Sequence, residues 1–160
     1  MSANTSLLYG HLRQRILDFD PSGQDMPLRV TLGARLFTLE PPDNALYPFV
    51  TQRLRFRSTG TGDDARLREQ SEIVFMIYGR PRASLATVER IADIIEESLL
   101  HYNTTAVGPL TIRGVVSRET LPAFQSPENR EIVQVRLVLS LTWWPTYRSQ
   151  LATASGAPAP

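Results

Sequence analysis

Histidine, serine and carboxylate side chains are the groups in this chain whose chemistry could catalyse a reaction or bind a metal. His11 and His101 lie far apart in the sequence, and neither has another ligand at a spacing such as H-x-H or H-x-x-x-H. No serine stands in a G-x-S-x-G or S-x-x-K motif. We therefore interpret both histidines as surface or helix-end residues, and we expect no catalytic residue, no metal and no cofactor.

A glycine pair and a group of carboxylates come closest to a binding motif. Gly60-Thr61-Gly62 resembles part of a phosphate loop, but that motif needs a lysine and the chain contains none. Asp93, Glu96 and Glu97 could form a metal or acid–base cluster, although on an amphipathic helix such residues are more often a solvated face. They could equally contact arginines of a neighbouring subunit, so Glu96 and Glu97 are candidate interface residues.

Three arginines alternate along one predicted strand. Arg53, Arg55 and Arg57 project from the same face at a spacing of about 6.5–7 Å. They form either the solvent face of an antiparallel sheet or a charged surface that meets acidic residues or nucleic acid. No aromatic residues are interleaved with them to stack on bases, so we favour contact with protein over contact with nucleic acid.

Large aromatic residues near the C-terminal end form a second candidate interface. Trp143, Trp144 and Tyr147 precede an Ala/Pro-rich segment, and Phe124 stands alone in a polar stretch. Tryptophan and tyrosine often dominate the binding energy of interfaces. The alternative is that this aromatic group caps the end of the sheet in the monomer core.

Composition restricts the class of protein. The 160 residues include 42% hydrophobic residues, no cysteine and a net charge of +1, so we expect one domain with its own core and no disulfide or thiolate zinc site. A protein that mainly binds nucleic acid would normally carry a clear positive excess. We see no secretory signal and no apolar run near the ~20 residues of a membrane helix.

Hydrophobic periodicity predicts the elements that position these residues. The first half shows a helix at about 4–18, a half-buried strand at 28–39 with alternating apolar residues, and a strand at 49–57. A glycine-rich loop over 58–64 leads to a strand at 73–78 that we expect to be covered on both faces.

The second half begins with the longest amphipathic pattern. Leu85, Val88, Ile91 and Ile95 recur at helical spacing after a plausible N-cap at Ser84. We then expect a loop at 103–109, a short strand at 110–116, a projecting polar loop at 117–130 and a strand at 131–142.

The predicted fold is therefore α/β (α+β). A single domain, residues 1–148, holds a mostly antiparallel sheet of about four to five strands packed by two helices. Residues 149–160 are expected to form a flexible tail.

The order of these elements and their local sequence patterns resemble those of the tail terminator (tail completion) proteins of long-tailed bacteriophages. Ile73 to Tyr78, then Arg80-Pro81-Arg82-Ala83-Ser84 and the helix around Val88-Glu89-Arg90-Ile91-Ala92-Asp93, look like the central strand and helix of that family. Glu131–Thr142 is similar to its final strand. The resemblance covers most of residues 5–147 and includes no catalytic motif.

The resemblance implies a structural virion protein, made in the host cytoplasm, that forms a hexameric ring at the head-proximal end of the tail tube. Such a ring stops tube polymerisation and joins the tail to the head connector. Its partners would be copies of itself, the tail tube protein and a connector or stopper protein, with no membrane and no sequence-specific nucleic-acid binding. DNA would pass through the lumen of the ring.

Three alternatives stay open at this point. A different neck protein, for head–tail joining or head completion, would have a similar sequence texture. A small enzyme would need a convergent set of catalytic groups that the sequence does not display. A nucleic-acid-binding regulator is disfavoured by the near-neutral charge.

Overall fold

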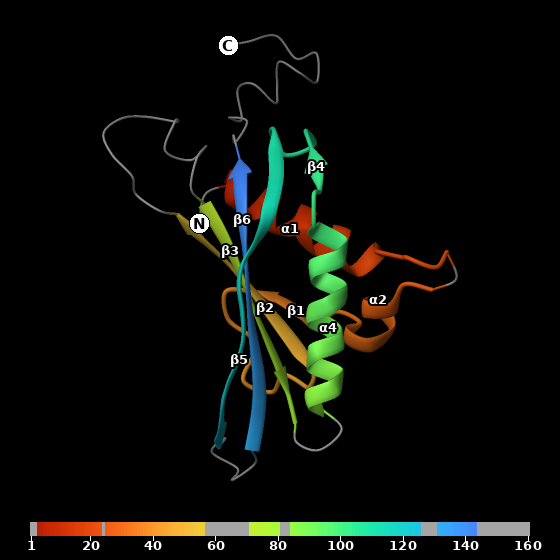
Figure 1. Ribbon diagram of the computed structural model, residues 1–160, viewed down its shortest axis with the longest axis vertical. Helices are drawn as coiled ribbons and strands as arrows, with labels where there is room; N and C mark the ends of the chain where they lie inside the picture. The colour runs from red at the N-terminus through yellow and green to blue at the C-terminus, as the bar shows by residue number, and fades with distance from the viewer. Residues whose placement is uncertain (1–2, 24, 57–70, 81–83, 126–130, 144–160) are drawn as a thin grey trace.

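Within the described part of the chain, six strands form one curled sheet in the order β1-β2-β3-β6-β5-β4 (Figure 1). The computed structural model describes residues 3–23, 25–56, 71–80, 84–125 and 131–143. Only the pair β1–β2 is parallel, and the other neighbours in the sheet are antiparallel. The strands are β1 (Leu36–Thr38), β2 (Phe49–Phe56), β3 (Ser71–Gly79), β4 (Asn103–Thr104), β5 (Leu110–Gln125) and β6 (Glu131–Trp143).

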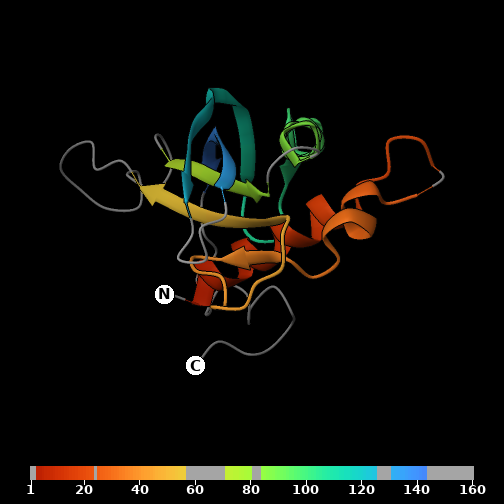
Figure 2. The same ribbon diagram turned by 90° about the horizontal axis from the view of Figure 1, so that it is seen from below.

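The helices α1 (Ala3–Asp18) and α4 (Ser84–Leu99) lie on the same side of this sheet, α1 toward β1 and β2 and α4 toward β3 and β6 (Figure 2). Their apolar residues join the inward-facing residues of the central strands in one core. We call the other side of the sheet the helix-free face, since none of the described helices covers it. The predicted α+β class and single domain are confirmed, with six strands in place of four to five.

Helix α1 was expected at 4–18, and the structure confirms it. Leu8, Leu12 and Ile16 recur every fourth residue and are fully buried. Tyr9 adds a polar tie to the sheet: its hydroxyl accepts a hydrogen bond from the backbone N–H of Leu54 at 2.7 Å. The side chain of Gln52 donates to the carbonyl oxygen of Tyr9 at 3.0 Å. These two bonds attach α1 to β2.

The strand predicted at 28–39 is wrong over most of its length. Residues Pro27–Leu32 form a short helix, α2, and only Leu36–Thr38 are a strand. Leu28 and Leu32 are both buried, and a spacing of four residues satisfies a strand period of two as well as a helical turn. Val30, which a strand would bury with them, is 76% exposed. Pro27 in the first turn also favours the helix.

The strands β2, β3 and β6 were predicted close to their observed bounds. Ile73 pairs with Leu139 and Leu54 in register, and Phe75 pairs with Leu137 and Gln52. All of these side chains are buried toward the helices. The alternate positions of β3 point to the helix-free face, and Val74 among them is also buried. This agrees with the prediction of a strand covered on both faces.

Helix α4 follows the predicted apolar stripe. Val88, Ile91, Ile95 and Leu99 are at most 1% exposed. Leu85 is an exception at 44%, since it lies in the first turn of the helix, beyond the part of the stripe that packs on the core.

The projecting loop predicted at 117–130 is also wrong where the structure describes it. Strand β5 continues through Ser117 to Gln125 and pairs with β6 to the end. Three register shifts interrupt the pairing, and they let the strand bend and twist. Beyond Thr111, β6 is the only strand among the described residues that pairs with β5. Pro122 therefore lies on an edge, where a missing N–H is tolerated. Asn103 and Thr104, expected in a loop, form β4.

None of the described helices is long and apolar enough to cross a membrane. The glycine-rich loop predicted at 58–64 and the tail predicted at 149–160 lie outside the described residues.

The buried stripe of α4 generates a stability prediction. We expect Ile91→Asp to destabilise the domain by at least about 2–5 kcal/mol, because it removes a buried aliphatic group and places a carboxylate in the core. Thermal unfolding followed by circular dichroism measures the loss, with the exposed neighbour Arg90→Asp as the control. A melting temperature for Ile91→Asp equal to that of Arg90→Asp would show that the orientation of α4 is wrong.

Candidate interface on two oppositely charged surfaces

Three arginines converge on the helix-free face of the sheet. Arg53 and Arg55 project from β2, and both are exposed. Arg136 projects from β6 on the same face, because it pairs in register with Met76 of β3, which in turn pairs with Thr51 of β2. We call Arg53, Arg55 and Arg136 the arginine surface.

Two of these arginines are held by acidic neighbours in the same chain. The guanidinium of Arg55 lies 3.8 Å from the carboxylate of Glu72, whose side chain is only 5% exposed. Arg136 donates through Nη2 to Glu119 Oε2 at 2.8 Å. These contacts restrict the positions of the Arg55 and Arg136 guanidinium groups. The restriction lowers the side-chain entropy that is lost when a partner binds.

The arginine surface borders a hollow of about 530 Å³. Val74, Met76 and Tyr78 of β3 form part of its lining, and Glu40 adds one carboxylate. Burial raises the pKa of the Tyr78 phenol, which a hydrogen bond with Thr51 partly offsets. The hollow thus combines an apolar lining with charged groups, as docking surfaces for protein side chains commonly do.

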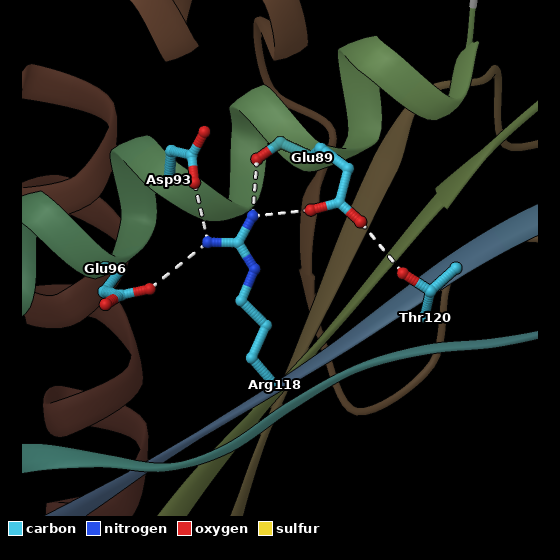
Figure 3. Close-up of polar contacts among 5 residues, drawn as sticks. All are labelled: Glu89, Asp93, Glu96, Arg118 and Thr120. Carbon is cyan, nitrogen blue, oxygen red and sulfur yellow. Dashed lines mark hydrogen bonds and ion pairs between the residues drawn. The ribbon is translucent and has the colours of Figure 1, made fainter.

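A second charged group lies on α4 and has the opposite sign. Arg118 of β5 reaches the helix and donates through Nη2 to Glu89 Oε2 at 2.6 Å and through Nη1 to Asp93 Oδ1 at 2.6 Å (Figure 3). The same Nη1 lies 3.3 Å from Glu96 Oε2, and Thr120 donates to Glu89 Oε1 at 2.9 Å. One guanidinium therefore faces three carboxylates.

These contacts shift the titration of the groups involved. The hydrogen bond from Arg118 lowers the pKa of Glu89 below its ordinary value of 4.5, against the opposing effect of partial burial. Burial alone would lower the pKa of Arg118, but hydrogen bonds to Glu89 and Asp93 outweigh it and raise that pKa further. Arg118 is thus always charged, and with the exposed Glu97 nearby the helix keeps an excess of negative charge. We call Glu89, Asp93, Glu96 and Glu97 the acidic surface.

The two surfaces lie on opposite faces of the sheet. Gln52 and Leu54 face the helices, so Arg53 and Arg55, at the alternate positions of β2, face away from them. The acidic surface lies on α4, which packs on the helix side of β3 and β6. A subunit with unlike, complementary surfaces on two faces has the geometry of head-to-tail association.

The structure distributes the predicted interface residues unevenly. Arg53 and Arg55 lie together, with Arg136 beside them. Glu96 is engaged by Arg118 of its own chain, while Glu97 is exposed. Phe124 is 42% exposed on the part of β5 that pairs with the start of β6. Three further candidates, Arg57, Trp144 and Tyr147, lie outside the described residues.

Trp143 is not the surface anchor that one interpretation of the sequence required. Its side chain is 1% exposed and belongs to the core. The indole N–H donates to the carbonyl oxygen of Val107 at 3.0 Å. The physical reason is that a buried indole needs an acceptor for its N–H, and the connection before β5 supplies one. Trp143 therefore caps the sheet, which is the alternative that the sequence left open.

His11 also departs from its expected surface role. It is half-buried, its Nε2 shares a hydrogen bond of 2.7 Å with the Tyr102 hydroxyl, and the two rings stack. Burial lowers the pKa of His11, and the neighbouring Arg15 lowers it further. His101 is exposed just after α4, as predicted for a helix-end residue. Across the described residues no group of three or more His, Asp or Glu side chains is placed to hold a metal ion.

Sequence reasoning missed Arg118 altogether, because it assigned that position to a loop. An available signal was the alternation of Arg118 and Thr120 with Ser117 and Glu119, which continues the strand pattern. Arg136 lies within the strand predicted at 131–142, but its approach to Arg53 and Arg55 depends on the pairing of β2, β3 and β6, which no local pattern reveals.

No protein-family model matches the chain, and no curated protein matches it either. Among solved structures the chain is similar to a chain described as "Virion of native gene transfer agent (GTA) particle", with 16% identity and a TM-score of 0.49. The match covers 89% of this chain and 98% of that chain. Because both the identity and the TM-score are low, we infer function from the surfaces of this chain.

The Arg118 contacts generate a prediction about pH. We expect Arg118→Met to lower the free energy of unfolding by about 1–2 kcal/mol near neutral pH, since partly exposed ion pairs contribute ~0.2–1 kcal/mol each. Glu89 has a lowered pKa in the folded state, so its contribution is present above 4.5 and disappears as pH falls through the folded-state pKa. The difference between wild type and variant should therefore shrink at low pH.

Urea unfolding at about pH 7 and about pH 3 measures both differences. Arg113→Met, an exposed arginine on the same strand, is the matched control. An equal difference between wild type and Arg118→Met at both pH values would contradict the assignment of these ion pairs.

Proposed function

We propose that this chain is a structural virion protein that closes into a ring, and that it serves as a tail terminator, which caps the head-proximal end of a phage tail tube. It acts by assembly and not by catalysis. Its partners in this proposal are further copies of itself, the tail tube protein on one side of the ring and a head connector or stopper protein on the other.

The observation that carries the proposal is that exposed arginines, Arg53 and Arg55, lie on one face of the sheet, and exposed carboxylates, Asp93 and Glu97, lie on the other. Because the two surfaces lie on opposite faces, one isologous interface could not include both of them. Head-to-tail contact pairs the surfaces, and repeated head-to-tail contact gives either an open filament or a closed ring. A cap must end the growth of a tube, and a closed ring does so.

The two rims of such a ring stay free for axial partners. The β5–β6 ribbon extends to one end of the molecule (Figure 1) and presents Phe124 at 42% exposure. Exposed aromatic residues are frequent anchors of protein interfaces. We assign Phe124 to the contact with the tube protein or the connector.

The order of elements also supports this assignment. The resemblance to tail terminators rests on a central strand, a turn, an amphipathic helix and a long final strand. The chain has β3, α4 and β6 in these roles, with β3 and β6 adjacent in the sheet.

Two measurements test the proposal. Purified protein should form rings by negative-stain electron microscopy, with a mass of several subunits by light scattering. Particles produced without this gene should carry tubes of uncontrolled length, because nothing ends polymerisation. Tubes of normal length that lack heads would favour the head–tail joining alternative. A protein that stays monomeric at all concentrations and is missing from the virion would overturn both.

A further inference from the structure

We infer that helix α4 of one copy docks on the arginine surface of the next copy, with Asp93 and Glu97 facing Arg55 and Arg53. This inference rests on the proposed ring and specifies its subunit contact. It commits to a second copy of this chain as the occupant of the hollow on the helix-free face.

Spacing is the first argument. Asp93 and Glu97 are one helical turn apart, a rise of about 6 Å along α4. Arg53 and Arg55 stand two residues apart on β2, a distance of about 6.5–7 Å. A helix laid along β2 therefore brings two carboxylates opposite two guanidinium groups at the same time.

Exposure is the second argument. The side chain of Asp93 is 65% exposed although it already accepts a bond from Arg118, so its second oxygen can accept another. Glu97 is exposed. On the opposite surface the side chain of Arg55 is 57% exposed while Glu72 holds it in place. Both sides thus offer exposed charged groups to a partner, and Asp93 and Arg55 are each restrained by a neighbour in their own chain.

Local charge distinguishes a second copy from nucleic acid. Glu40 lines the hollow, Glu72 contacts Arg55 and Glu119 contacts Arg136. Because these carboxylates stand among the three arginines, a continuous phosphate backbone would meet repulsion along with attraction, whereas separate carboxylates on a helix can contact Arg53 and Arg55 alone. A helix that carries both acidic residues and the charged Arg118 matches this mixed surface better.

The test uses charge reversal at two exposed residues for which no ion pair is found within the described part of the chain. Arg53→Glu and Glu97→Arg should each abolish rings, as measured by light scattering and negative-stain electron microscopy. Joined in one chain, the two changes should restore rings, because the charges are complementary again. An equimolar mixture of the two single variants should also form rings, since every junction between unlike copies is then complementary.

Controls separate folding from docking. Arg53→Lys keeps the charge and should keep rings, and Arg113→Glu makes the same charge change on an exposed arginine of β5 and should keep them as well. Melting temperatures of all variants should lie close to that of wild type. In the mixture, junctions between the two unchanged surfaces alternate with junctions between the two changed ones, so rings there show that both kinds of junction form.

Each outcome bears on a different statement. If Arg53→Glu forms the same rings as the wild type, the inference is overturned and the proposed function stands. The same conclusion follows if neither the double variant nor the mixture forms rings. Loss of binding to DNA by Arg53→Glu, with rings intact, would show that nucleic acid occupies the hollow. Absence of rings from the wild type overturns the proposed function itself.

Discussion

The register between β3 and β6 is the constraint on which the rest of this structure depends. Ile73, Phe75 and Ile77 pair with Leu139, Leu137 and Val135, and all six face the helices. Since side chains alternate along a strand, a slip of one residue would send these groups to the helix-free face. It would also turn Arg136 into the core. The same pairing that builds the core therefore places the arginine surface.

Charge separation follows from this arrangement without disturbing the core. Alternate positions of β2 and β6 supply arginines to one face, and the solvent arc of α4 supplies carboxylates on the other side. Arg118 joins the acidic surface to β5, so the helix, the edge of the sheet and the carboxylates have one fixed geometry. A surface fixed in this way can meet a partner with little further ordering. The proposed ring uses the folded subunit as it stands.

Local patterns predicted those elements whose periodicity is unambiguous. The stripe of α4 and the alternation of β6 extend over many residues, and both elements lie within a few residues of their predicted bounds. The strand predicted around Leu28 and Leu32 was wrong because their spacing fits a strand and a helix equally. The loop predicted over 117–130 was wrong at residues 117–125 because a polar sequence with a proline resembles a loop, although an edge strand paired on one side tolerates both features.

The candidate site shows the same limit. The alternation of Arg53 and Arg55 was visible in the sequence, but the hollow that they border is made by three strands distant in the chain. Arg118 meets Glu89, Asp93 and Glu96 only because β5 runs on past its predicted end. Trp143 could not be assigned from sequence, because the acceptor that satisfies its indole, the carbonyl oxygen of Val107, belongs to another segment.

Chemical crosslinking tests the central claim of head-to-tail contact most directly. The chain contains no cysteine, so Arg53→Cys and Glu97→Cys in one chain provide the only two thiols, while Arg55 and Asp93 stay in place to direct the contact. A short bis-maleimide should join the thiols of neighbouring copies and give a ladder of crosslinked species on a denaturing gel, which ends at the size of the closed ring. Either single-cysteine chain should give no ladder under the same conditions. A double-cysteine protein that yields only monomers, or that stops at dimers, would contradict the contact.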